Sequence, residues 1–342
     1  MSTLYQAVAD QLQELIEQQV YKAGERLPGV RALSERFDVS IATILQAHQL
    51  LESRGVVEAR ERSGYYVRRP SGQAPVPAMV RPDPVPAEVS ARSLTIELVH
   101  AAQDRRVVPF GAAVPHADFL PLKQIQQAHA WAARRGVETL GYAFPGVMAL
   151  RRQIAQRMTA LGAPVTPDQM IITSGGQECL ILAMRAVTRS GDIVAVESPS
   201  FPGILQVLDI LGLRAIEIPT DPEHGISLDG LRLALEQWPI RACIVVPNHA
   251  NPLGCRLSDA RKQALVSLLA GANVPLIEDD IYGDLPFSGE RPRPAKAWDR
   301  TGHVIYCGSF SKTISPGLRI GWIEPGRYMD PVIYQKYFMN IA

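Results

Sequence analysis

The sequence of 342 residues contains neither a long apolar run nor a large excess of charge of one sign. A membrane-spanning helix needs about 20 mostly apolar residues in a row, and the chain has no such run. A secretory signal starts with a basic segment that an apolar one follows, whereas the first basic residue here is Lys22. The sequence therefore predicts a soluble, cytoplasmic protein without a membrane partner.

Cysteine is scarce, and the charges nearly cancel. Lys and Arg number 35 and Asp and Glu 34, so the formal net charge is +1 and no global positive field attracts nucleic acid. Any DNA contact must come from local patches. The four cysteines are scattered, unlike the paired ligands of a zinc site or the dense spacing of a secreted disulfide scaffold. We expect reduced thiols and no metal site.

Proline, in contrast, is concentrated in one stretch. Six prolines fall between residues 69 and 88. Because proline removes backbone donors and favours extended geometry, this stretch is typical of a semi-rigid spacer. We predict an N-terminal domain over residues 1–68, a Pro-rich linker region over 69–105 and a second domain over 106–342. A length of 342 residues is compatible with this division.

The first of these domains has the pattern of three helices and a hairpin. Apolar residues at three- and four-residue steps predict a helix near the N-terminus. A second helix is expected to have Pro28 in its first turn. The third begins at its cap Ser40 and ends at Gly55. The segment VVEARERSGYYV then places apolar runs on either side of a charged tip, which is typical of a two-stranded hairpin.

This order predicts a winged helix-turn-helix, whose third helix enters the major groove of DNA. The segment ERLPGVRALSERFDVSIATILQAHQLLESRGVVEARERSGYYV resembles the DNA-binding domain of the GntR family of regulators. The resemblance implies double-stranded operator DNA as a partner. It also implies phosphate or base contacts from Arg26, Arg31, Ser40, Thr43, Arg62, Ser63 and Gly64.

Two positions depart from the family pattern. Family members often carry arginine after the residue at 40 and in the next turn, where this chain has Ile41 and Leu45. We therefore expect phosphate contacts more than base reading from the third helix. Residues 1–68 hold eight Lys or Arg and nine Asp or Glu, so most of this charge can also be an ordinary solvated surface. A winged helix that docks a protein instead of DNA is the alternative.

From residue 106 onward, apolar strand-like runs alternate with helical stretches. The runs are MIITSG, DIVAVESP, RAIEIP, ACIVVPN, VPLIEDD, HVIYCGS and RIGWIE. Runs rich in Val and Ile between helices predict an α/β domain with a mostly parallel sheet buried on both faces. Ligands of such sheets bind at the carboxyl ends of the strands.

Four strand ends carry polar residues that fit one ligand. They are SGGQE, NHANPLG, DDIYGD and GSFSKTISPGLRIGW, and each alone is more often an ordinary turn or surface loop. Together they offer a phosphate cradle, a donor amide, a carboxylate, an amine and an arginine. Pyridoxal 5′-phosphate (PLP) requires this set, because its aldehyde, its ring nitrogen and its phosphate each need a partner.

The second domain is similar to the aspartate-aminotransferase-like group, fold type I, over residues 106–342. SFSK followed by GLRIGW is the most specific element. By resemblance, Lys312 is the Schiff-base lysine, Asp279 pairs with the ring nitrogen, and Asn251 and Tyr282 hydrogen-bond the ring oxygen. The remaining positions that the resemblance assigns are the phosphate ligands Gly175, Gly176, Ser309 and Arg319, the stacking residue Phe201, and Tyr142, which reaches the phosphate of a partner subunit. We expect Asp280 to lie behind the site or at the surface.

A GntR-type domain, a linker and a fold type I domain in one chain resemble the MocR subfamily of transcriptional regulators. The resemblance implies a homodimer in which an amine or amino acid effector, or PLP itself, alters DNA binding. The alternative is an active aminotransferase with an appended DNA-binding domain. The arginine that binds the substrate carboxylate in the family has no counterpart up to residue 342, and we expect the C-terminal part of the domain to be missing from this sequence.

Overall fold

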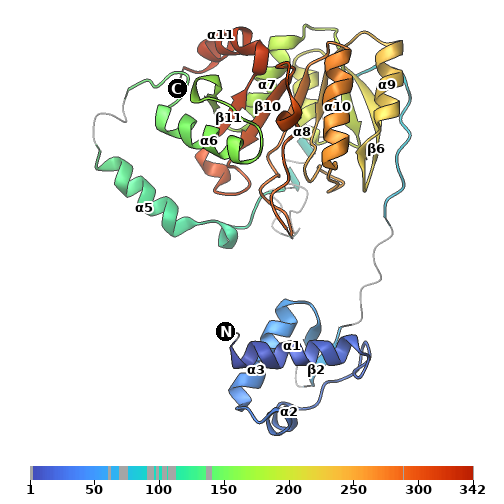
Figure 1. Cartoon of the computed structure of the whole chain (residues 1–342), viewed down its shortest axis with the longest axis vertical. Helices are drawn as coiled ribbons and strands as arrows, with labels where there is room; N and C mark the ends of the chain where they lie inside the picture. Colours follow the sequence, from blue (N-terminus) through green and yellow to red (C-terminus); the bar gives the residue numbers. More distant parts are fainter. Residues whose placement is uncertain are drawn as a thin grey trace. The chain divides into compact units, whose positions relative to one another are not determined.

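The computed structural model describes residues 3–60, 63–68, 76–90, 96–97, 100–101, 106, 113–135, 141–287 and 289–341. The chain divides into two compact units, Met1–Val76 and Pro77–Ala342, and each is described by itself. Figure 1 labels their helices and strands. Within the described ranges, no helix combines the length and the apolar character that crossing a membrane requires.

The first unit is a winged helix-turn-helix, as predicted. Its elements are α1 (Leu4–Glu17), α2 (Val30–Phe37), α3 (Ile41–Ser53), β1 (Val57–Arg60) and β2 (Gly64–Val67). The two strands pair antiparallel and form the wing. Leu12, Leu33, Ile44 and Leu51 are fully buried between the helices, so the amphipathic pattern of the sequence closes a single core.

The helix ends agree with the sequence except at Pro28. The side chain of Ser40 accepts a hydrogen bond from the backbone N–H of Thr43 and caps α3. α2, however, begins after its cap Gly29, so Pro28 lies outside the first turn. The reason is that Leu27, the residue before Pro28, is hydrogen-bonded to the wing: its backbone N–H donates to the carbonyl of Tyr65 over 2.8 Å.

The second unit is built on a mixed but mostly parallel sheet. Among the described residues the strand order is β3-β6-β5-β8-β9-β10-β11-β4, and β7 pairs with β6. β5, β6, β8, β9 and β10 run parallel, whereas β11 is antiparallel to both of its neighbours. The strands are β3 (Ala87–Glu88), β4 (Ile171–Thr173), β5 (Ile193–Ser198), β6 (Arg214–Asp221), β7 (Gly225–Ile226), β8 (Ile240–Val245), β9 (Leu276–Asp279), β10 (Val304–Ser309) and β11 (Gly321–Glu324).

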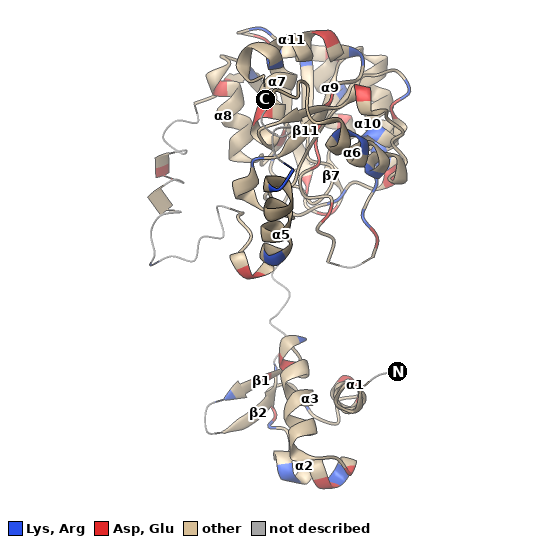
Figure 2. Cartoon of the chain, turned by 90° about the vertical axis from the view of Figure 1, so that its left-hand side faces the viewer, with Lys and Arg blue, Asp and Glu red and all other residues tan. Residues whose placement is uncertain are grey.

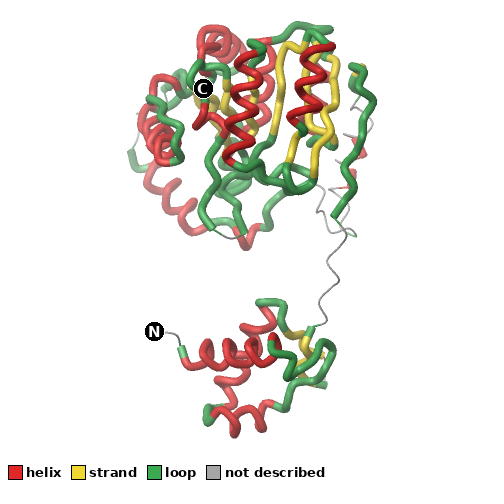
Figure 3. The backbone as a smooth tube through the Cα atoms, turned by 45° about the vertical axis from the view of Figure 1, so that its right-hand side comes forward, coloured by secondary structure: helices red, strands yellow, loops and turns green. Residues whose placement is uncertain are grey.

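Helices cover both faces of this sheet (Figure 3). Alternate residues of β5 enter different cores: Val194 and Val196 pack with α7 and α8, and Ile193 and Ala195 pack with α9 and α10. The helices are α5 (Leu122–Ala133), α6 (Met148–Ala160), α7 (Gly176–Val187), α8 (Pro202–Ile210), α9 (Leu228–Gln237), α10 (Asp259–Gly271) and α11 (Met329–Met339), with short 3₁₀ turns η2 (Ala117–Phe119), η4 (Pro167–Gln169), η5 (Ala295–Trp298), η6 (Pro316–Leu318) and η7 (Gly326–Tyr328). The strands are therefore buried on both sides, as their composition predicts.

Part of the proline-rich stretch packs against the second unit. β3 adds an edge strand beside β6. The carbonyl of Pro84 accepts a hydrogen bond from the Trp238 indole (3.1 Å), and that of Pro86 accepts one from Arg214 (2.8 Å). Prolines can occupy a sheet edge because they still offer carbonyl groups. Residues 84–88 thus belong to the second unit in contacts, although the sequence places them in a linker.

Candidate functional site

The turn between β4 and α7 forms a tight cradle around a guanidinium. Gly175 has a φ of +89°, which favours glycine, and a Cβ atom there would overlap the guanidinium of Arg319. Arg319 donates from Nη2 to the carbonyl of Ser174 over 2.9 Å. The first backbone N–H groups of α7 open beside this charge, and a helix N-terminus with a guanidinium suits a phosphate.

Two buried serines extend the cradle from β10. Ser309 ends this strand, and its hydroxyl lies 2.9 Å from the hydroxyl of Ser311. Ser311 in turn accepts a hydrogen bond from Arg319 over 3.4 Å. The sequence predicts Ser309 as a phosphate ligand but not Ser311. Both stand in the SFSK motif, and their two-residue spacing is the feature that points to Ser311.

Asp279 ends β9 with an unsatisfied carboxylate oxygen. The side chain is buried, and its Oδ1 atom has no hydrogen-bond partner among the described residues. Burial, reinforced by the charge of Asp280, raises the pKa of Asp279 to about 7. A buried polar atom without a partner is costly. Oδ1 is therefore suited to accept a hydrogen bond from an N–H group of a ligand.

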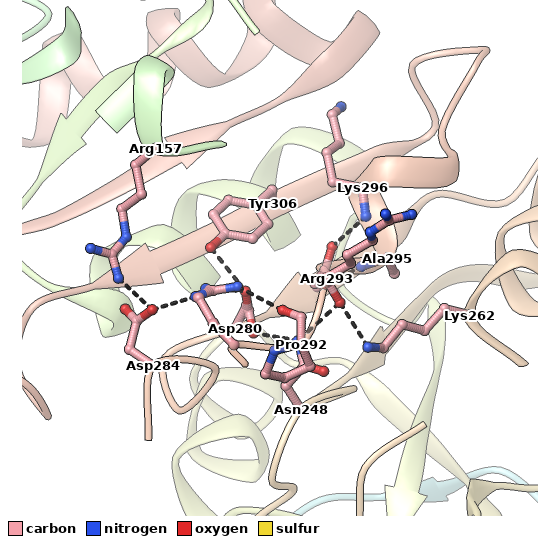
Figure 4. A network of polar contacts seen from close by, with 12 residues as sticks. Arg157, Asn248, Lys262, Asp280, Asp284, Pro292, Arg293, Ala295, Lys296 and Tyr306 are labelled. Atoms are coloured by element: carbon pink, nitrogen blue, oxygen red, sulfur yellow. Dashed lines mark hydrogen bonds and ion pairs between the residues drawn. The ribbon is translucent and has the colours of Figure 1, made fainter. Parts of the chain in front are cut away.

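Asp280 faces a polar network behind the site (Figure 4). Its carboxylate accepts hydrogen bonds from Asn248 (2.8 Å), Tyr306 (3.0 Å) and Arg291 (2.8 Å). Arg291 also contacts Asp284, which pairs with Arg157 of α6. Asp280 is buried and fully engaged in protein contacts, so of the two expected positions, behind the site or at the surface, the structure shows the first.

Lys312 lies in the loop after β10. Its Nζ atom donates a 2.8 Å hydrogen bond to the carbonyl oxygen of Ala113. Burial lowers the pKa of the Lys312 ammonium, and the nearby Asp279 carboxylate opposes this effect. A lysine whose pKa is lowered by burial is a better nucleophile, because more of the amine is neutral.

The remaining residues expected around a ring lie on neighbouring loops. The side-chain amide of Asn251 donates to the hydroxyl of Tyr282 over 3.2 Å. Burial raises the pKa of the Tyr282 phenol. The Lys312 amine lies 6.0 Å from the centre of the Tyr282 ring. Phe201 precedes α8 and is partly buried.

One cavity of about 130 Å³ brings most of the expected residues together. Its lining includes Gly176, Phe201, Asp279, Ser309, Lys312 and Arg319. The cavity is also lined by three residues that the sequence did not predict: Gln177, Leu180 and Ile281. Four expected residues are not among those that line this cavity: Gly175, Asn251, Tyr282 and Tyr142. Tyr142 is 80% exposed.

These groups fit PLP on three structural grounds. The oxygen of Asp279 has no partner in the described part of the chain. Gly175 leaves space beside Arg319, and the Cβ atom of any other residue would overlap the Arg319 guanidinium. Lys312 lines the same cavity as Asp279 and Arg319. A pyridine nitrogen, a phosphate and an aldehyde are the groups that such an oxygen, cradle and amine can hold.

In the first unit, several residues expected at DNA lie on α2, α3 and the wing. Arg26 and Arg31 are exposed. Arg26 lies against the wing, since a Cβ atom at Gly64 would come 3.3 Å from its Nε atom. The hydroxyl groups of Ser40 and Thr43 hydrogen-bond each other at the start of α3 over 2.8 Å. Arg62 lies outside the described residues.

The wing and the outer face of α3 present different chemistry. Ser63 shares a 2.7 Å hydrogen bond with the hydroxyl of Tyr66. Ile41 and Leu45 are 46% and 41% exposed, so the family's arginine positions carry exposed apolar groups here. Lys and Arg residues are interspersed with Asp and Glu residues along the ribbon of this unit (Figure 2). Residues 1–68 carry eight Lys or Arg against nine Asp or Glu, so the unit has no excess of positive charge.

Two family models match different parts of the chain. Residues 4–67 match the family model of bacterial regulatory proteins, gntR family. Residues 107–324 match the model of aminotransferase class I and II. The uncharacterized HTH-type transcriptional regulator YjiR of Escherichia coli (strain K12) is 45% identical over 340 residues, which are 99% of this chain and 72% of that protein.

Solved aminotransferases share the fold of the second unit. The multiple substrate aminotransferase of Thermococcus profundus superposes with a TM-score of 0.66 at 25% identity, over 73% of this chain and 64% of that one. LysN of Thermus thermophilus, an α-aminoadipate aminotransferase solved with N-(5′-phosphopyridoxyl)-L-leucine, gives 0.63 at 25% identity, over 74% and 67%. The chain spans about two thirds of the length of these enzymes.

The fold and the matches define a DNA-binding winged helix joined to a PLP-binding domain of the aminotransferase type. The chain belongs to the GntR-type transcriptional regulators whose second domain is an aminotransferase class I and II domain, the MocR subfamily. It is thus a PLP-binding transcriptional regulator by family.

Proposed function

We propose that this regulator senses a small amine or amino acid at the PLP site through Lys312 and changes its grip on operator DNA in response. The amine of Lys312 borders the cavity that Asp279 and Arg319 also line. PLP, when bound, supplies an aldehyde that reacts with primary amines. An effector amine that competes with Lys312 for that group can regulate only if it favours one arrangement of the protein over another.

The residues of the cavity have separate tasks in this proposal. Lys312 would hold the cofactor covalently, and Asp279 would accept a hydrogen bond from the protonated ring nitrogen. Asn251 and Tyr282, already hydrogen-bonded to each other, share the ring oxygen. The phosphate is held by Gly175, Gly176, Ser309 and Arg319, and Phe201 stacks on the ring. The unsatisfied Oδ1 atom of Asp279 carries the proposal, because it has no protein partner among the described residues.

The assembly and the DNA contacts are further parts of the proposal. We assign a homodimer, in which Tyr142 reaches the cofactor phosphate of the partner subunit. Its 80% exposure supports this assignment, because a side chain used by a partner must be free of its own chain. At the operator, Arg26, Arg31, Ser40, Thr43, Arg62, Ser63 and Gly64 contact phosphates or bases.

The alternative, an aminotransferase with an appended DNA-binding domain, uses the same ring-binding residues. We favour the regulator, because a relative that covers 99% of this chain is named a transcriptional regulator. A mobility-shift assay on the DNA upstream of the gene itself, with and without PLP and candidate amines, tests this choice. Sensing predicts that an amine changes DNA affinity without sustained product formation. Turnover of about 1–10³ s⁻¹ on an amino acid would instead favour the enzyme.

A further inference from the structure

A second cavity of about 580 Å³ adjoins Lys312, and of the residues assigned to the cofactor only Lys312 and Tyr282 line it. One wall is the segment 113–120, and the other includes Tyr282, Asp284 and Leu285. Lys312 belongs to the lining of both cavities. The volume falls in the range of small-molecule sites, and no residue role assigned above uses most of this space.

The walls of this cavity are predominantly apolar. Its apolar lining residues are Ala113, Val114, Pro115, Phe119, Leu120 and Leu285. Phe119 is 83% exposed, Val114 57% and Leu285 43%. Large apolar side chains grouped around an opening commonly mark a binding surface. A ligand that covers them is stabilised by the removal of this apolar surface from water.

The charged groups in the lining are not free to select a charged ligand. They are Lys312 and Asp284. Lys312 is assigned to the cofactor. The Asp284 carboxylate contacts the guanidinium groups of both Arg157 and Arg291 (Figure 4). A second ammonium group on the ligand would have to compete with these two existing ion pairs for Asp284. It would also lose its water of hydration.

The orientation of Lys312 places the amine end of a ligand at this cavity. Its Nζ atom donates to the carbonyl of Ala113, which itself lines the wall. A ligand whose amine approaches the position of Lys312 therefore directs the rest of its body along the segment 113–120.

We infer that this cavity holds the body of the effector, and that the effector is a primary amine or amino acid with an aliphatic or aromatic side chain. The inference rests on the proposed function, since it assumes that the effector amine engages the site at Lys312. Val114, Phe119, Leu120 and Leu285 are its specificity-determining residues.

The test compares amines of matched shape on the full-length protein loaded with PLP. The pairs are pentylamine with 1,5-diaminopentane, and L-norleucine with L-lysine. Two readouts are taken: the change in visible absorbance of the lysine-bound cofactor, and the release or capture of operator DNA. We expect the apolar member of each pair to bind at least about tenfold more tightly, because the ammonium group of the other member would be buried without a partner.

A pair of variants places the preference in the cavity. Leu285→Glu introduces a free carboxylate into the wall, whereas Phe287→Glu makes the same change at a fully exposed residue outside the lining. Leu285→Glu should lower the affinity for pentylamine and raise that for 1,5-diaminopentane. Phe287→Glu should keep the original preference. Both positions are exposed enough to accept the change, and retained cofactor absorbance shows that each variant is folded.

Three results would overturn the inference, and they are distinguishable. Equal or tighter binding of the charged members would refute the apolar class but leave the sensor intact. A preference that Leu285→Glu does not alter would remove it from this cavity. If no amine changes either the absorbance or DNA binding, the proposed function fails together with the inference.

Discussion

Asp279 and Asp280 are neighbours in the chain but have opposite surroundings. Asp280 accepts hydrogen bonds from Asn248, Tyr306 and Arg291. Asp279 is equally buried, yet its Oδ1 atom finds no partner among the described residues. At the end of β9, the Asp280 carboxylate is thus engaged in hydrogen bonds within the protein, whereas Oδ1 of Asp279 is available to a ligand.

This contrast predicts different defects for the two residues. Asp279→Ala should weaken PLP binding by about 3–5 kcal/mol, because the ring nitrogen loses its anion in a buried site. Asp280→Asn should instead lower the free energy of unfolding, since Arg291 then loses one of its two carboxylate partners. Titration of PLP and thermal denaturation measure the two effects. An unchanged PLP affinity in Asp279→Ala would mean that another group holds the ring.

Gly175 tests the phosphate cradle separately. Gly175→Ala puts a methyl group against the Arg319 guanidinium and should reduce PLP affinity at least about tenfold through loss of a charged hydrogen bond. Gly191→Ala is the matched control, because Gly191 has a φ of +88° but nothing within 4 Å of the added atom. Both positions have a positive φ, so both variants bear backbone strain. Equal PLP affinities in the two variants would contradict the cradle.

Because His48 is buried, we expect the free energy of unfolding of the DNA-binding unit to fall at acidic pH. The imidazole is buried in α3 against the Tyr65 ring, with centroids 4.2 Å apart, and burial lowers its pKa to about 4. In the unfolded chain the pKa is near 6.5. Its contribution is therefore complete above pH about 6.5 and is lost as the pH falls toward about 4, by up to about 3 kcal/mol.

Hydrogen exchange of the α3 amides in the full chain measures this loss. His48→Phe should make α3 protection nearly independent of pH over that interval. His129→Phe, at an exposed histidine of α5, should leave the dependence as it is. Acid sensitivity that persists in His48→Phe would assign it to another group.

Arg31 separates phosphate contact from base reading. Arg31 is exposed on α2, so Arg31→Ala should weaken binding to all DNA sequences about equally and reduce the slope of the salt dependence by about 1. Arg54→Ala is the control, because Arg54 pairs with Asp10 over 2.7 Å and has no assigned DNA contact. Fluorescence anisotropy at several salt concentrations gives both quantities. Selective loss for one sequence would make Arg31 a base reader.

Periodicity and strand composition were enough to predict both folds. The apolar steps of the first unit predict its three helices, and the Val- and Ile-rich runs predict β4, β5, β6, β8, β9, β10 and β11. Three of the four strand-end motifs contribute residues to the cavity, because the ends of parallel strands meet at one edge of a sheet. Local pattern carries this information.

The features that the sequence did not predict depend on contacts between distant segments. The burial of Asp280 is compensated by Arg291, which is eleven residues away and outside any motif. Pro84 and Pro86 pack on the second unit through Trp238 and Arg214, more than a hundred residues later. Ala113 meets Lys312 across 199 residues. Tertiary folding alone creates these pairs.

The central claim is that a lysine in the aminotransferase-type domain controls DNA binding by the other domain. The most direct measurement is the affinity of the full-length protein for its operator, with PLP and with PLP plus an apolar amine, for the original chain, for Lys312→Ala and for the exposed control Lys123→Ala. We predict that the amine changes the affinity of the original chain and of Lys123→Ala, whereas Lys312→Ala binds DNA but shows no visible cofactor absorbance and no response. An equal response in Lys312→Ala, or none in the original chain, would contradict the account.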